Sequence, residues 1–146
     1  MKEETTRSLS KKLEKVRNCI EGDAYLTEHV IGKNPELADY LSNLISEKGV
    51  TTAQIIEKGN ISKNYIYNIL NGERKNPGRD KVIALCIGIG ATFAETNRAL
   101  ELVRHAPLYP KDERDVRIAV AVNKGTMDVV SLNLILEEHG LEPLDV

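Results

Sequence analysis

The 146-residue sequence is poor in aromatic residues, at 4%, and has no apolar segment long enough to span a membrane. Its most apolar stretch, VIALCIGIGATFA, is too short and is interrupted by glycines. The first residues, MKEETTRSLSKKL, lack the apolar centre of a secretory signal. We therefore expect a cytoplasmic protein that has no membrane partner.

Cysteine and histidine are also scarce, with two and three residues. Cys19 and Cys86 are far apart and form no CxxC pair, so we interpret both as reduced thiols that behave as small hydrophobic residues. The histidines have no metal-ligand spacing, and His105 and His139 are each expected to close a helix. Ser62 is more simply explained as a helix cap than as a nucleophile. The sequence predicts no metal site, no cofactor and no enzyme.

The charges nearly balance, with a net charge of -2, but they are unevenly distributed. Between Ser62 and Lys81 five basic residues exceed two acidic ones, whereas between Ala91 and Val146 ten acidic residues exceed six basic ones. A basic segment beside an acidic one allows one face to meet phosphate while the rest repels it. An ordinary solvated surface has the same pattern, so that alternative stays open.

Apolar residues recur at helical spacing along the chain, which predicts an all-α fold. The segment Arg79–Ile89 is apolar over most of its circumference and is predicted to be the central core helix. Gly88 and Gly90 precede no GKS or GKT motif, so we assign them to close packing and a helix stop. The other predicted helices run near Thr5–Gly22, Ala24–Val30, Pro35–Gly49, Thr51–Gly59, Ser62–Leu70, Thr92–His105, Asp112–Lys124 and Thr126–Gly140.

The most informative segment, Val50–Lys81, predicts two short helices joined by a tight turn. Thr51 or Thr52 can cap the first helix, because a threonine hydroxyl accepts a hydrogen bond from an unpaired amide of the first turn. Gly59 and Asn60 tolerate a left-handed backbone and end this helix.

The second of these helices, which Ser62 caps, is predicted to have a polar face. Its buried stripe consists of Ile66, Ile69 and Leu70. The remaining positions carry mainly amides and phenols: Lys63, Asn64, Tyr65, Tyr67, Asn68 and Asn71. Such a helix, followed by Gly72-Glu73-Arg74-Lys75, is suited to a polar partner, and DNA is the first candidate.

This segment resembles the phage-repressor (Cro-like, Xre-type) helix-turn-helix family. The features that carry the resemblance are a threonine-capped helix, a three-residue turn, inward Ile66 and Ile69, and then Asn71-Gly72-Glu73-Arg74 and Pro77. The resemblance covers roughly Leu37–Leu100. It implies a five-helix, lambda-repressor-like domain whose third helix enters the major groove of DNA.

This resemblance implies two groups of contacts with double-stranded DNA. We expect base contacts from Asn64, Tyr65, Tyr67 and Asn68, because an asparagine amide can both donate to and accept from adenine. We expect phosphate contacts from Thr52, Lys63, Asn71, Arg74, Lys75 and Arg79. The family usually has a phosphate-clamping glutamine at the position of Thr52, and Lys63 is the only charge on this recognition helix.

The function expected from these contacts is sequence-specific transcriptional regulation by a homodimer. One monomer makes few base contacts, so useful affinity needs two recognition helices about one DNA turn apart. The alternative is a helical protein-interaction or adaptor module that uses the same fold to hold a protein partner.

The C-terminal part of the sequence repeats the part before it. The motifs Arg79-Asp80, Ile83-Ala84 and Gly90 recur 35 residues later as Arg114-Asp115, Ile118-Ala119 and Gly125. A second set recurs 36 positions later, because the second copy has one inserted residue. Its members are Asn97, Leu100, Glu101, Pro107 and Leu108, which recur as Asn133, Leu136, Glu137, Pro143 and Leu144. We therefore predict that the last two helices repeat the two before them and pack beside them.

The N-terminal segment Thr5–Gly22 is predicted to be amphipathic, with one apolar seam formed by Leu9, Leu13, Val16 and Ile20. Two heptads are too few for an independent coiled coil, so this helix must pack on its own subunit or on a partner. We expect three parts: an N-terminal helix and connector at 1–34, a helix-turn-helix DNA-binding domain at 35–106, and a helical hairpin at 107–146 packed on it.

Overall fold

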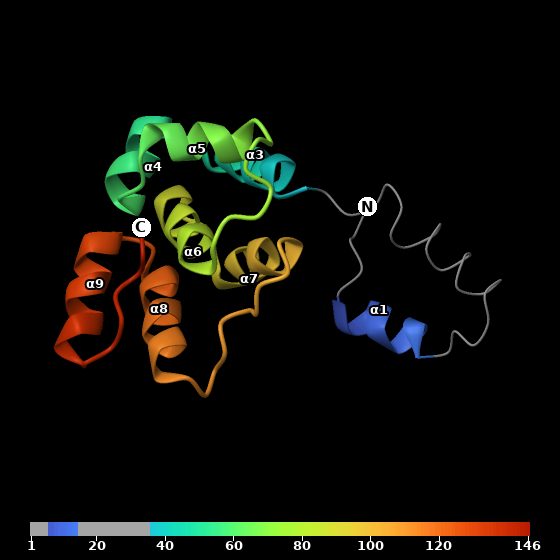
Figure 1. The fold of residues 1–146 in the computed structure, drawn as a ribbon. Coiled ribbons are helices and arrows are strands. Elements are labelled where there is room, and N and C mark those ends of the chain that lie inside the picture. The colour runs from blue at the N-terminus through green and yellow to red at the C-terminus, as the bar shows by residue number, and fades with distance from the viewer. Residues whose placement is uncertain (1–5, 15–35) are drawn as a thin grey trace. The chain divides into compact units, whose positions relative to one another are not determined.

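The computed structural model describes residues 6–14 and 36–146, which are helical and contain no strand (Figure 1). The chain divides into two units, Met1–Pro35 and Glu36–Val146. In the first unit the described helix is α1, Thr6–Leu13. The predicted continuation to Gly22, the connector helix at Ala24–Val30, and Cys19 lie outside the described residues. None of the helices described could cross a membrane, because none is both long and apolar enough.

The second unit holds seven helices, so the all-α prediction is confirmed for the described residues. They are α3 (Leu37–Lys48), α4 (Thr52–Gly59), α5 (Lys63–Leu70), α6 (Arg79–Ile89), α7 (Phe93–Leu102), α8 (Glu113–Lys124) and α9 (Val129–Glu138). The segment 35–106 contains the first five, and α8 and α9 form a hairpin after them.

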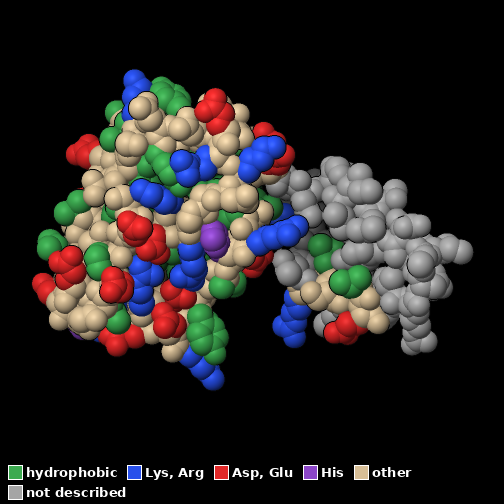
Figure 2. All heavy atoms as spheres, viewed as in Figure 1, with side chains coloured by type: hydrophobic (Ala, Val, Ile, Leu, Met, Phe, Trp, Pro, Cys, Tyr) green, Lys and Arg blue, Asp and Glu red, His purple; other side chains and the backbone are tan. Residues whose placement is uncertain are grey.

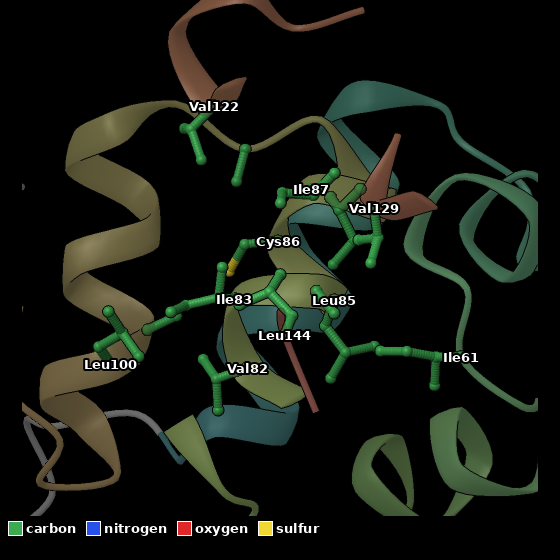
Figure 3. Packing of buried hydrophobic residues seen from close by; sticks show 14 of the residues in the cluster. Ile61, Val82, Ile83, Leu85, Cys86, Ile87, Leu100, Val122, Val129 and Leu144 are labelled. Carbon is green, nitrogen blue, oxygen red and sulfur yellow. The ribbon is translucent and has the colours of Figure 1, made fainter. Parts of the chain in front are cut away.

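Helix α6 is the central core helix, as predicted. Every residue from Val82 to Ile89 is buried, and Figure 3 shows its side chains among Leu100, Val129 and Leu144 from other parts of the unit. Figure 1 shows α4 and α5 on one side of α6 and the α8–α9 hairpin on the other. Burial raises the pKa of the Cys86 thiol to about 12, so this thiol is protonated and packs as a small hydrophobic group.

Helices α4 and α6 cross at close range, because each has a glycine at the contact. A Cβ atom on Gly59 would lie 2.8 Å from the carbonyl oxygen of Ala84, and one on Gly88 would lie 2.9 Å from that of Ile55. Gly90 has a φ of 82° and ends α6 in the left-handed conformation. The packing and stop roles predicted for Gly88 and Gly90 are therefore confirmed.

The predicted repeat is confirmed by matching hydrogen bonds in the two copies. Arg79 Nε donates to Ala106 O at 3.0 Å, and Arg114 Nε donates to Glu142 O at 2.8 Å. A second pair of matching hydrogen bonds joins α7 and α9 each to the segment that follows it. The Leu108 amide donates to Asn97 Oδ1 and the Leu144 amide to Asn133 Oδ1, at 2.9 and 2.7 Å.

The hairpin packs against the preceding helices within the same unit. Val129, Leu132 and Leu136 of α9 and Ile118 of α8 are buried in one cluster with the residues of α6. The hairpin and the helices before it therefore share one buried cluster.

Two helix starts differ from the sequence prediction. Helix α3 begins at Leu37 and not at Pro35, because Glu36 has the extended backbone of an N-cap, with φ -70° and ψ 157°. Helix α9 is capped by Asp128 and not by Thr126. The Asp128 carboxylate accepts a hydrogen bond from the Ser131 amide at 2.8 Å, and this bond fixes the first turn.

The end of α7 also differs, because the helix stops at Leu102 and not near His105. Arg104 has a φ of 61°, and the His105 amide bonds back to Leu100 O at 2.9 Å. This left-handed closure ends the helix earlier than its apolar pattern indicates. Phe93, the first residue of α7, is 38% exposed.

Candidate nucleic-acid interface

Each helix of the motif begins with a side-chain cap. The Thr51 hydroxyl accepts from the Gln54 amide at 3.2 Å, and Gln54 Oε1 accepts from the Thr51 amide at 2.9 Å. Thr51 is therefore the cap, and Thr52 is the first helical residue. Asn60 ends α4 with a φ of 53°, and the Ser62 hydroxyl then caps α5 through the Tyr65 amide at 3.2 Å.

Helix α5 has one buried side and one polar side. Of the predicted apolar stripe, Ile66 and Ile69 are buried at 0% and 1% exposure, and Leu70 is half-buried against the core. Lys63, Asn64 and Tyr67 are exposed, and Asn68 is half-buried. Lys63 Nζ lies 5.6 Å from the centre of the Tyr67 ring, so the single cation of this helix lies beside its most exposed aromatic residue.

The structure places Tyr65, a predicted base contact, away from this exposed side. Its half-buried ring has Arg74 Cζ at 5.0 Å and Lys81 Nζ at 4.9 Å from its centre. Burial raises the pKa of the Tyr65 phenol, while the nearby Arg74 charge lowers it. Tyr65 therefore acts as an aromatic support that holds two cations together, a contact worth about 0.5–1 kcal/mol per cation at exposed sites.

The segment after α5 is held by short hydrogen bonds. Asn71 Oδ1 accepts from the Glu73 amide at 2.9 Å, and the Arg74 amide donates to Asn68 O at 2.9 Å. Gly72 has a φ of 81°, which this tight turn requires. Arg74 and Lys75 are both exposed, so the turn presents two cations next to the polar side of α5.

The far end of this segment is anchored to the helices behind it. Pro77 is buried, and its carbonyl oxygen lies 2.8 Å from His105 Nε2. His105 therefore has a structural contact after the end of α7. His139 likewise lies 2.9 Å, through Nδ1, from Ile135 O at the end of α9.

Arg79, a predicted phosphate contact, is already engaged within the chain. Its guanidinium donates to both carboxylate oxygens of Asp115, at 3.0 and 2.9 Å, and also to two backbone carbonyls of the segment after α7. A phosphate would have to displace these bonds. We therefore exclude Arg79 from the candidate interface and assign it a structural role.

The cations that remain form one group, which we call the cation cluster: Lys63, Arg74, Lys75 and Lys81. Sequence reasoning counted Lys81 only in the local charge and missed its place beside Tyr65, because α5 and α6 meet only in the fold. Asp80 is paired with Arg114 at 3.1 Å, so Glu73 is the only carboxylate of residues 62–81 outside such a pair. Figure 2 shows Lys and Arg side chains on the face of α5 and the start of α6.

The described residues thus combine a polar helix face with an adjacent basic group. Such an arrangement can place amides against base edges while cations contact phosphates on either side. Comparison of the chain with protein-family models, with curated proteins and with solved structures finds no match.

Proposed function

We propose that this protein is a sequence-specific DNA-binding regulator that acts as a homodimer. In this proposal α3–α7 form a five-helix, lambda-repressor-like domain, and α4 and α5 are its helix-turn-helix. The observation that carries the proposal is the exposed side of α5, where Asn64 and Tyr67 lie beside the cation cluster. The resemblance to the phage-repressor family supports the same reading.

The proposed role of α5 is to read base edges in the major groove. Asn64 and Asn68 can each make two hydrogen bonds with adenine, and Tyr67 can contact a thymine methyl group or a sugar. Because these groups are nearly uncharged, we expect adenine–thymine pairs at the centre of each half-site.

The cation cluster has a different proposed role, because phosphate contacts set register and carry no sequence information. Arg74 and Lys75 are exposed, and Lys81 is half-buried beside the ring of Tyr65. Asn71 and Thr52 lie at the two ends of the motif as further candidates for phosphate hydrogen bonds.

The second candidate function is a protein-interaction module. It is favoured by the low charge of α5 and by the exposed ring of Tyr67, which is 47% accessible. Aromatic residues with a polar tip are common at protein interfaces. The two functions differ in salt dependence, because only phosphate contacts release condensed counterions.

Selection of bound sites from random DNA by the purified protein tests the first function. We expect a symmetric site, and Asn68→Ala should relax the preference at one symmetric pair of positions, by about 1–3 kcal/mol per lost bidentate contact. Asn43→Ala, which removes an exposed amide of α3, is the matched control and should leave the preference unchanged. Recovery of unrelated sequences by the wild-type protein would refute base reading.

A further inference from the structure

The repeat leaves one helix face without the cover that its counterpart has. In the first copy, α4 packs closely on α6, at Ala84 and Gly88, and the adjacent Leu85 is 1% exposed. The equivalent face of α8, 35 residues later, consists of Val116, Ala119, Val120 and Asn123. We call these four residues the α8 face. Within the unit Glu36–Val146, no helix equivalent to α4 covers them.

The exposure of the α8 face shows the consequence. Val120 is 58% exposed, although its counterpart Leu85 is buried, and Val116 is 39% exposed. On the neighbouring helix α9, Val130 and Leu134 are 51% and 58% exposed. Exposed valines and leucines at helical spacing are typical of a surface that another helix covers.

The charges at the two ends of α8 are complementary to each other. The helix begins with Glu113 and ends with Lys124, and both are exposed. If two copies of α8 pair in antiparallel directions, Glu113 of each copy lies near Lys124 of the other, and Val116 lies near Val120. Such a self-complementary pattern fits a two-fold contact, in which the same patch is used by both subunits.

We propose that the α8 face binds the α8 face of a second copy of this chain. A stable interface buries about 1,200–2,000 Å² in total, more than one helix face provides. The exposed Val130 and Leu134 supply further apolar area on the same hairpin. Figure 1 shows this hairpin on the opposite side of α6 from α5, so the proposed contact leaves the candidate DNA surface free.

This inference rests on the proposed function only in assigning a surface to the dimer, and it can be tested without DNA. Sedimentation equilibrium of the full chain should show a dimer. Val120→Asp should weaken the dimer about tenfold or more, because it places an unpaired charge in the contact. Ser46→Asp, which adds the same charge at an exposed position of α3, should have no effect. A monomeric wild-type chain, or an unchanged Val120→Asp dimer, would overturn the proposal.

Charge reversal tests the antiparallel arrangement. Glu113→Lys and Lys124→Glu should each weaken the dimer, because each creates two like-charge contacts, and the double variant should restore it. Glu113 also pairs with Arg117 at 3.1 Å within its own helix, and the double variant does not restore that bond. Recovery therefore reports the contact between copies, and a double variant weaker than both singles would overturn it.

The two proposals can fail separately. A dimer of the predicted kind that binds no DNA would contradict only the proposed function. A chain that binds a selected site while remaining monomeric would contradict only the α8 contact. A monomer that instead binds a helix of another protein through Val120 would also overturn self-association.

Discussion

The guanidinium of Arg79 and the carboxylate of Asp115 form a two-pronged ion pair, with bonds of 3.0 and 2.9 Å. In this pair the first copy of the repeat supplies the arginine and the second supplies the aspartate. In a second ion pair the roles are reversed: Arg114 of the second copy donates through Nη2 to Asp80 Oδ2 of the first, at 3.1 Å. Each aspartate also accepts a backbone amide from the other copy: Asp115 from Tyr109, and Asp80 from Asp145. The α6–α7 and α8–α9 pairs therefore contact each other reciprocally, as two-fold-related units do.

Removal of Arg79 should be strongly destabilising, because Asp115 is 7% exposed and would be left as a buried charge. We expect Arg79→Ala to lower the free energy of unfolding by about 3 kcal/mol. Urea titration of Arg79→Ala, Asp115→Ala and the double variant should show that their effects on the free energy of unfolding are strongly non-additive. The exposed pair of Arg117 and Glu113 is the control, and its coupling should stay below about 1 kcal/mol. Equal coupling in both pairs would contradict this account.

Stability should depend on pH through Asp115. Burial alone would raise the pKa of this carboxyl, but its bonds with Arg79 and with the Tyr109 amide hold it below the ordinary value of 3.8. A lowered folded-state pKa gives stability that is fully present above the ordinary pKa and is lost as the pH falls through the folded value. Asp115→Asn should therefore lose stability at neutral pH and show a shallower acid decline. A parallel decline in both proteins would argue against the pair.

The close contact of α4 and α6 should not tolerate a methyl group. A Cβ atom at Gly88 would lie 2.9 Å from Ile55 O and 3.0 Å from Ile55 Cγ2, so one helix must move. We expect Gly88→Ala to lower the free energy of unfolding by about 1–3 kcal/mol. Gly78→Ala is the control, because no atom lies within 4 Å of its Cβ position, and it should cost only the weaker cap of α6, roughly 0.5 kcal/mol. Similar losses at both positions would refute the contact.

Truncation after Pro110 should destabilise the remaining helices. It removes Asp115 and the buried Leu132 and Leu136, so Arg79 loses its partner and part of the α6 surface becomes exposed. We expect a lower urea midpoint and self-association through the exposed apolar surface, measured by light scattering. A truncated chain that is monodisperse and equally stable would show that the hairpin is an independent appendage.

Much of the fold can be predicted from local sequence signals. The Thr92-Glu95 capping box, the Gly49 and Gly90 stops and the apolar circumference of α6 each depend on residues close in sequence, and the structure has all of them. Val120 shows the limit. It lies among apolar residues of α8 and aligns with the buried Leu85, yet it is 58% exposed, because the repeat provides no helix to cover it.

The candidate site was predictable only in part. The inward Ile66 and outward Tyr67 follow from helical spacing alone, whereas Tyr65 and Arg79 depend on partners distant in sequence. Tyr65 meets Lys81 only once α5 packs near α6, and Arg79 meets Asp115 only once the hairpin folds back. Whether such side chains are exposed and available to a ligand depends on these tertiary contacts, which the local sequence pattern does not contain.

The central claim is that the polar side of α5 and the cation cluster bind DNA, and a salt titration of binding tests it most directly. For the wild-type chain, the logarithm of the binding constant should fall linearly with the logarithm of salt concentration. The slope should become shallower by roughly one per lost phosphate contact in Arg74→Ala with Lys75→Ala. Lys111→Ala removes an exposed cation elsewhere and should leave the slope unchanged. Binding that is insensitive to salt, or an equal slope in the double variant and the wild type, would contradict the account.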